Sequence, residues 1–256
     1  MPGTTIRQST RSKPKILVRE IVQLDDPAVV AAHRVLRGTF KRGELVSIRE
    51  WRDSLHERMG GVWTDIAWHL FVGELDGEVV GVATGTYLGN VNIGFVGYLS
   101  AVQRVRGRRL GSRLRNRLCA AFRRDARRIR GQPLEAVVGE VRSDNPWLRH
   151  LIRDPRVLAL DFLYLQPPLR SGAPSVPLVL YYQSVGGPVT HLFAAKVRQL
   201  LYTAWRRAYR ISRPLASRTF RRMLESLAGR HRIGELRWPV GGRLLDDSRR
   251  GRRAAR

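Results

Sequence analysis

Residues 101–129 constrain the fold more than any other stretch, because they combine a basic, glycine-containing turn with a long amphipathic helix. Apolar side chains recur every three or four positions from Leu110 to Ile129, which places them along one helical face. Ahead of the helix, Gly107 lets the backbone bend, and Gly111 allows close approach to the first helical turn. The first amides of a helix lack intrahelical partners and lie at the positive end of its dipole. The stretch therefore predicts a strand–turn–helix unit that binds a pyrophosphate.

Positive charge surrounds this turn, and we assign one set of residues to the predicted phosphate site. The set is Ala101, Arg104, Arg106, Gly107, Arg108, Arg109, Leu110, Gly111 and Ser112. The arginines supply fixed positive charge, and the glycines and the helix start supply accessible backbone amides. A glycine turn also serves ordinary strand-to-helix connections, so the assignment depends on the elements around it.

Two periodicities predict the surrounding elements. Apolar runs bounded by turn residues predict strands at residues 15–23, 69–75, 79–87, 93–101, 134–141, 157–165 and 176–184. Helices are predicted from Pro27, from Ser47, over 110–129 and from Asn145-Pro146. Ser47 and Glu50 form a capping box, and Asp76-Gly77 favours a tight hairpin turn.

The resulting order is strand, two helices, three strands, helix, strand, helix and two strands. This order and the stretch from Arg104 to Gly111 resemble the GNAT superfamily of N-acetyltransferases. Its acyl-CoA pyrophosphate loop has the form Gln/Arg-x-x-Gly-x-Gly/Ala. The resemblance implies a mixed α/β fold, with a central, mostly antiparallel sheet flanked by helices. It also implies acetyl-CoA as cosubstrate and no metal, with the acetyl group passing directly to an amine.

Arg109 departs from the loop pattern in either possible register. If the pattern starts at Arg106, Gly111 matches and Arg109 replaces the first glycine. If it starts at Arg104, Gly107 matches and Arg109 replaces the last small residue. A side chain at this position opposes close approach of the pyrophosphate to the amide.

The stretch from Glu140 to Asn145 reads EVRSDN and resembles the Glu-Val-Arg-x-x-Asn signature of ribosomal-protein and peptide α-amine acetyltransferases. The resemblance makes Glu140 the general base and places Asn145 beside the pantetheine arm. A carboxylate suits this role, because an ammonium must lose a proton before its nitrogen can attack a thioester. The alternative is that Glu140 only pairs with one of the many arginines. Between residues 90 and 131 the sole carboxylate is Asp125, on the helix, so Glu140 is the leading candidate.

The acid of the family signature is missing. The tyrosine expected seven residues after the asparagine is Ile152 here, which cannot protonate a thiolate. Tyr164 or His150 could supply the proton, or the thiolate could leave unassisted. Tyr164 is our second catalytic candidate, although a packed strand aromatic is the simpler interpretation.

Beyond Val185 the resemblance ends and two basic amphipathic helices follow. Their predicted apolar faces contain Phe193, Val197, Leu200, Leu201, Ala204, Ala208 and Ile211 in the first, and Phe220, Met223, Leu224 and Leu227 in the second. Their polar faces carry Arg198, Arg206, Arg207, Arg210, Arg218, Arg221 and Arg222. These helices could pack on the sheet or form a dimer contact, or they could bind RNA or an anionic membrane surface.

We therefore expect a disordered basic tail over residues 1–14, the GNAT domain over 15–188, basic helices over 189–240 and a disordered charged tail over 241–256. The net charge of +26 favours a polyanionic partner, but all but four of the 47 basic residues are arginine, which codon bias also produces. A lone cysteine and no apolar span of about 20 residues indicate a cytoplasmic protein that is not transmembrane. The rival hypothesis is a catalytically silent GNAT-like domain whose basic arm binds nucleic acid.

Overall fold

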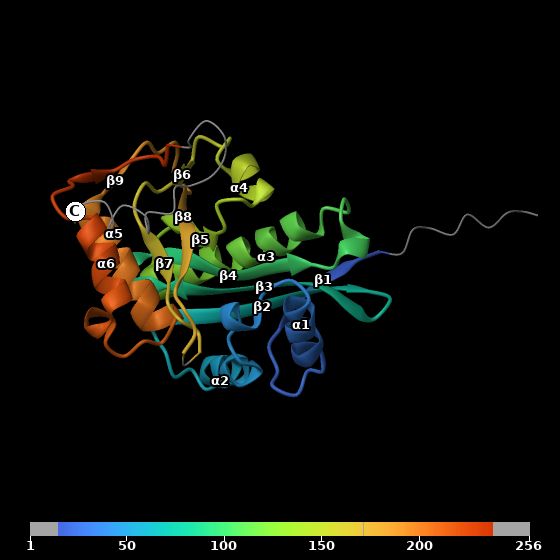
Figure 1. Cartoon of the computed structure of the whole chain (residues 1–256). Coiled ribbons are helices and arrows are strands. Elements are labelled where there is room, and N and C mark those ends of the chain that lie inside the picture. Colours follow the sequence, from blue (N-terminus) through green and yellow to red (C-terminus); the bar gives the residue numbers. More distant parts are fainter. Residues whose placement is uncertain (1–14, 171, 238–256) are drawn as a thin grey trace, which may run out of the picture.

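The computed structural model describes residues 15–170 and 172–237, which surround one mixed sheet (Figure 1). The sheet contains β1 (Leu17–Ile21), β2 (Ile66–Leu75), β3 (Glu78–Leu88), β4 (Ile93–Ala101), β5 (Ala136–Val141), β6 (Val157–Ala159), β7 (Tyr164–Gln166) and β8 (Val176–Ser184). Its order is β1-β2-β3-β4-β5-β8-β6, with β7 also pairing with β8. Only β4 and β5 run parallel, so the predicted mixed, mostly antiparallel sheet is confirmed.

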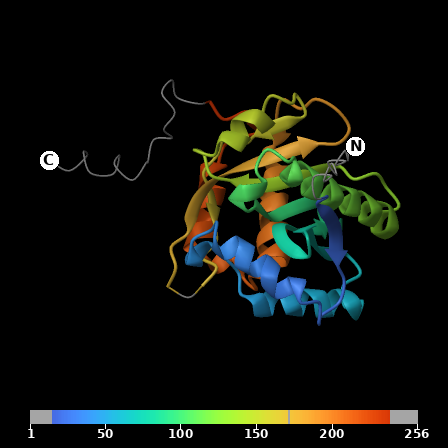
Figure 2. The ribbon, with the colours of Figure 1, turned by 90° about the vertical axis from the view of Figure 1, so that its right-hand side faces the viewer.

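Helices cover both faces of the sheet (Figure 2). They are α1 (Ala28–Arg37), α2 (Ile48–Met59), α3 (Leu110–Asp125), α4 (Pro146–Leu151), α5 (Ala194–Thr203) and α6 (Arg218–Ser226), and π-helical turns at Ala126–Arg130 and Ala204–Ala208 extend α3 and α5. A small hairpin pairs β9 (Leu192–Phe193) with β10 (Arg232–Ile233). Helix α3 packs on one face, whereas α1 and α2 pack on the other.

The C-terminal helices pack on the sheet beside α1 and α2. Phe95 of β4 and Val138 of β5 share a buried cluster with Leu200 of α5 and Phe220 of α6. The neighbouring strand residues point to the opposite face, because side chains alternate along a strand. The packing alternative for these helices therefore holds. Phe193 is the exception: it was expected on the apolar face, but it is 60 % exposed because it lies in β9, before α5 begins.

Local signals placed several element ends correctly. Ser47 caps α2, and the reciprocal bonds with Glu50 form the predicted capping box. Asp76 and Gly77 both have positive φ angles, 51° and 80°, in the β2–β3 turn. Backbone geometry of this kind suits a two-residue hairpin.

One segment that we predicted as a single strand forms two strands. Residues 157–165 were expected as a single strand, but they form β6 and β7, which both pair with β8. Between the pairs Ala159–Tyr181 and Tyr164–Leu178, the β6–β7 side has two more residues than β8, and the Phe162 amide turns back to the Leu160 carbonyl at 3.1 Å. The extra residues bend the chain away from β8 before pairing resumes. On its other edge, Leu160 forms an isolated bridge with Glu235 of the C-terminal segment.

The predicted terminal tails, residues 1–14 and 241–256, lie outside the described residues. Within the part of the chain that the structure describes, no helix has the length and apolar character that a membrane span requires.

The parallel strands β4 and β5 diverge, and this divergence creates the main cleft. They pair only from Ile93 opposite Ala136 to Val96 opposite Gly139. Beyond this point, the pairing of β3 with β4 shifts register where Gly97 and Tyr98 oppose Thr84, and the Tyr98 amide donates to Thr84 Oγ1 at 3.0 Å. A bulge of this kind bends the strand. The last residues of β4 therefore present backbone groups to the gap rather than to β5.

Candidate active site

A cleft of about 910 Å³ occupies the gap between the diverging strands. Its lining includes Ala101 at the end of β4 and Glu140 on β5, together with the glycine turn before α3. The strand bulge, the turn and the helix start thus face one space. The structure brings together predicted cofactor-site residues that are up to 44 positions apart in the chain, from Ala101 to Asn145.

The glycine turn has the backbone geometry of an anion site. Gly107 has φ +78°, and Arg109, the residue before α3, has φ +56°. The first hydrogen bond of the helix runs from the Arg113 amide to the Arg109 carbonyl at 3.1 Å. The amides of Leu110, Gly111 and Ser112 precede that bond, so they point out of the helix start toward a ligand.

Most residues predicted for the phosphate site line the cleft, and two do not. Those that line it are Ala101, Arg106, Gly107, Arg109, Leu110, Gly111, Ser112 and Asn145. Arg104 instead pairs with Glu78 Oε1 at 2.5 Å on the surface, and Arg108 lies outside the lining. Asn145 caps α4 by accepting the Trp147 amide at 3.0 Å. The roles of these residues remain predictions.

Two observations fit a bound acyl-CoA. A Cβ added at Gly107 or Gly111 would meet nothing within 4 Å among the described residues, so protein packing does not require either glycine. Tyr181 belongs to the cleft lining, and its buried hydroxyl forms no hydrogen bond of good geometry among the described residues, although the Arg115 guanidinium lies close enough to interact with it. A buried hydroxyl without such a bond is costly unless a ligand or water satisfies it.

Glu140 sits in a pocket of neutral donors rather than beside an arginine. Its Oε1 accepts from the Tyr164 hydroxyl, and its Oε2 accepts from the Tyr209 hydroxyl and, at 3.2 Å, from Gln166 Nε2. The structure therefore does not show the arginine pairing that was the alternative for Glu140. Burial raises the pKa of Glu140 to about 7, although the three hydrogen bonds act in the opposite direction.

Residues 44–153 match the sequence profile of the Acetyltransferase (GNAT) family. Through this segment, which spans less than half of the chain, the sequence is similar to GNAT acetyltransferases. A GNAT-family protein from Bacteroides thetaiotaomicron has a solved structure that aligns with a TM-score of 0.55 at 17 % identity, covering 77 % of this chain and 99 % of that one. Ribosomal-protein-alanine N-acetyltransferase from Brucella melitensis aligns with a TM-score of 0.47 at 16 % identity, covering 66 % and 99 %. No curated protein matches the sequence.

Tyr209 is a member of the Glu140 site that sequence reasoning missed. It follows the π-helical turn Ala204–Ala208, well outside the GNAT-matched segment. Its ring packs edge-on against Phe95 at 5.9 Å between centroids, and Gln166 Nε2 donates to its hydroxyl at 3.2 Å. No spacing rule links a residue at 209 to one at 140, because their contact depends on how the C-terminal helices dock. Burial raises the pKa of Tyr164 and of Tyr209 well above that of free tyrosine, so both remain donors to the carboxylate.

A second, smaller cavity adjoins the cleft of the GNAT domain. It has a volume of about 340 Å³ and shares Gly97, Tyr98 and Gln166 with the lining of the cleft. Tyr209 also lines it. The side chains that hold Glu140 therefore stand at the junction of the two spaces.

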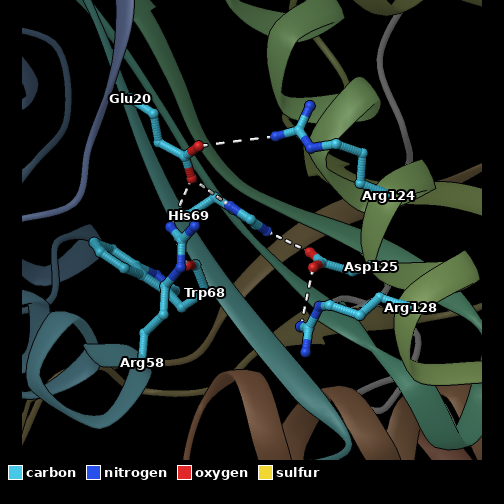
Figure 3. Close-up of polar contacts among 7 residues, drawn as sticks. All are labelled: Glu20, Arg58, Trp68, His69, Arg124, Asp125 and Arg128. Atoms are coloured by element: carbon cyan, nitrogen blue, oxygen red, sulfur yellow. Dashed lines mark hydrogen bonds and ion pairs between the residues drawn. The ribbon is translucent and has the colours of Figure 1, made fainter. Parts of the chain in front are cut away.

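A charge network, three of whose members (Arg58, Asp125 and Arg128) line this second cavity, joins strands and helices beside it (Figure 3). His69 of β2 is 2 % exposed; its Nδ1 lies 2.6 Å from Glu20 Oε1, and its Nε2 lies 2.5 Å from Asp125 Oδ2. Arg58 pairs with Glu20 at 2.6 Å, and Arg128 pairs with Asp125 at 3.1 Å. Burial raises the pKa of both carboxyl groups, but the bonds to His69 and the arginines outweigh it and leave each pKa below its usual value.

This network joins β1, β2 and the end of α3, and a carboxylate oxygen lies at each ring nitrogen of His69. Asp125, expected on the outer helix surface, is in fact 7 % exposed and bonded to His69 and Arg128. It lines the second cavity but not the cleft. Because both of its oxygens already have partners in the network, Glu140 stays the candidate base.

Proposed function

We propose that the protein is an N-acyltransferase that transfers an acetyl group from acetyl-CoA to an amine. The observation that carries the proposal is one cleft with a helix amino terminus at one end and a partly buried glutamate on its wall. The first site suits a pyrophosphate, and the second suits proton removal from an ammonium. The match of residues 44–153 to the GNAT family supports acyl transfer in general.

In this proposal, Glu140 takes a proton from the acceptor ammonium, directly or through water. Its pKa of about 7 leaves an appreciable fraction ionised at neutral pH, while making it basic enough to accept the proton. The freed nitrogen then forms a bond to the thioester carbon, and the carbon–sulfur bond breaks. Acetyl-CoA supplies the activated acyl group, and the chain supplies orientation, proton removal and a site sheltered from water.

Tyr164 fits a positioning role better than that of the missing acid. Its hydroxyl donates to Glu140, it is 2 % exposed, and it does not line the cleft. His150 is exposed and does line the cleft. In this proposal the departing thiolate takes its proton from His150 or from solvent. Tyr164 and Tyr209 hold the Glu140 carboxylate in place.

The rival hypothesis, a silent domain with a nucleic-acid-binding arm, has no observation that favours it. Of the seven arginines expected on the polar faces of the arm, four bond within the protein: Arg198, Arg207, Arg210 and Arg221. Their donors are used in holding the helices to the fold and to one another. The net positive charge still allows a polyanionic partner, which stays an untested expectation.

Calorimetry with acetyl-CoA tests the proposal directly. Gly107→Glu places bulk and negative charge at the turn, so we expect it to abolish binding. Gly131→Glu is the matched control, because Gly131 also has a positive φ of 65° and open space around its Cβ position, at the far end of α3. Equal affinity of both variants would show that the turn does not hold the pyrophosphate.

A further inference from the structure

The second cavity lies where an acceptor could reach Glu140. Gln166 and Tyr209 line this cavity, and both bond to the Glu140 carboxylate. The cavity shares three residues with the cleft, so the two spaces meet beside the carboxylate. An amine held in the smaller space and a thioester held in the larger one would approach each other at this junction.

A C-terminal segment, Arg207–Arg210, forms one wall of the cavity. Arg210 Nη1 and Nη2 donate to the two carboxylate oxygens of Glu57 on α2 at 3.0 and 2.7 Å, and Nη2 also donates to Ser54 Oγ at 2.9 Å. Two-point arginine–carboxylate pairing of this kind is among the stronger polar contacts in proteins. The segment is therefore fastened across the cavity to α2.

A second fastening lies nearby. Arg207 Nη2 donates to Asp65 Oδ2 at 3.0 Å, and its guanidinium lies 5.1 Å from the ring centroid of Trp63. Asp65 and Trp63 belong to the connection between α2 and β2. Two successive arginine anchors, three residues apart, thus close the side of the cavity that faces away from the cleft.

We propose that this cavity binds the acceptor and that the acceptor is a small amine rather than the amino terminus of a protein. This inference rests on the proposed acyl transfer. A volume of about 340 Å³ is at the small end of ligand sites, which span roughly 300–1,000 Å³. An extended peptide needs a groove that accommodates about 3.3 Å per residue, and the anchored segment Arg207–Arg210 limits how far a peptide could extend through this cavity.

The lining also indicates the character of the small amine. Trp51, Trp68 and Phe95 contribute aromatic surface, which favours an apolar body and attracts a cationic nitrogen. Charged side chains line the cavity too, but they are paired within the protein: Arg58 with Glu20, Arg128 with Asp125, and Arg210 with Glu57. The amine end points to Gln166 and Tyr209, beside Glu140. The acceptor is thus a compact primary amine with an apolar body, of the kind represented by 2-phenylethylamine.

The test compares two probe sets by CoA thiol release from acetyl-CoA. One set holds 2-phenylethylamine, tyramine and isopentylamine, and the other holds hexapeptides with free alanine, serine or methionine amino termini. We expect kcat/KM for at least one small amine to exceed that for every peptide by at least ~10-fold, about 1.4 kcal/mol of selectivity.

Arg210→Gly then opens the wall. Arg210 has φ +57°, which glycine adopts without a Cβ penalty, so the variant removes the anchor without adding backbone strain. We expect the selectivity for small amines to fall at least ~3-fold. Arg206→Ala is the matched control, since Arg206 is exposed in the same segment and does not line the cavity. Its selectivity should stay at the wild-type value.

The outcomes separate the two proposals. If wild-type protein acetylates peptides at least as well as every small amine, the acceptor class proposed here is wrong and acyl transfer stands. If Arg210→Gly keeps the full preference for small amines over peptides, the wall formed by Arg207–Arg210 does not determine that preference, and the inference is wrong. If no probe of either set releases thiol while acetyl-CoA binds, both this inference and the proposed reaction are overturned.

Discussion

The proposed acyl-CoA cleft and the proposed acceptor cavity meet beside Glu140, but different parts of the chain build them. The cleft is lined mainly by residues between the end of β4 and α4, inside the family-matched segment. The cavity draws on α2, four strands and a segment more than fifty residues beyond that match. A phosphate site can be built from local backbone, because a turn and a helix start are contiguous. An acceptor site needs walls from elements that only the tertiary fold brings together.

Truncation after Val185 should produce the largest effect. It would remove Leu200, Trp205, Phe220 and Met223 from a cluster that they share with β4, β5 and β8. Burying each such side chain is worth about 1.5–3 kcal/mol, so the remaining domain should aggregate or lose its cooperative thermal transition. Size-exclusion chromatography and calorimetry would measure this. A chain ending at Arg237 keeps every described residue and is the control.

That truncation also tests how separable the two sites are. A soluble fragment that melts as wild type and binds acetyl-CoA normally would show that the cleft is independent of the C-terminal helices. It would also restore the arm as a candidate for binding RNA, to be checked by the salt dependence of affinity.

Glu140→Gln should have the next largest effect. Because its pKa is about 7, activity of the wild type should fall as pH drops below 7, where the carboxylate becomes protonated. The amide cannot act as a base, so kcat should drop at least ~10-fold and the acidic limb of the pH profile should disappear. Affinity for acetyl-CoA should change little, since the helix amino terminus lies elsewhere in the cleft. A fully active variant would return Glu140 to a structural role.

Tyr209→Phe should move the acidic limb rather than remove it. The Tyr209 hydroxyl bonds to the ionised carboxylate and lowers its pKa, so its loss should raise the midpoint by about one pH unit. Tyr164→Phe should act in the same direction. Tyr182→Phe is the control, because its hydroxyl bonds to Glu135 at 2.9 Å instead. An unchanged midpoint in both test variants would mean that the C-terminal segment does not tune the base.

Arg109→Gly should have the smallest effect, a change in the free energy of unfolding that arises at the turn beside the cleft. Arg109 holds a left-handed backbone conformation, which costs a residue with a Cβ about 1–2 kcal/mol. Glycine relieves that strain but gains freedom in the unfolded chain, so we expect about 0.5–1 kcal/mol of net stabilisation. Arg117→Gly, at an exposed position inside α3, should instead destabilise the protein by about 1 kcal/mol. Thermal denaturation of the pair would show whether the two changes have opposite signs.

The sequence predicted what local chemistry determines. The Ser47–Glu50 box, the Asp76-Gly77 turn and the span of β4 were all recognisable, because each depends on residues close together in the chain. It also indicated the order of elements that places Glu140 near the turn. The loop pattern showed that Arg109 replaces a glycine, but only its positive φ angle showed that the residue holds a left-handed backbone conformation.

What the sequence could not predict depends on docking between distant segments. The hydroxyl of Tyr209 reaches Glu140 across 69 positions, and Arg210 reaches Glu57 across 153. The C-terminal segment also reaches the end of β6, where Leu160 forms a bridge with Glu235. Amphipathic spacing showed that the last helices would pack, but not which residues would enter the site.

The attachment of Tyr209 to Glu140 has a consequence for synthesis on the ribosome. Chains grow at about 5–20 residues per second, so about 3–11 s separate the addition of residue 153 from that of residue 209. During that interval Glu140 lacks its second tyrosine, and the second cavity lacks the wall formed by Arg207–Arg210. The proposed acyl-transfer activity therefore begins only when the C-terminal helices dock.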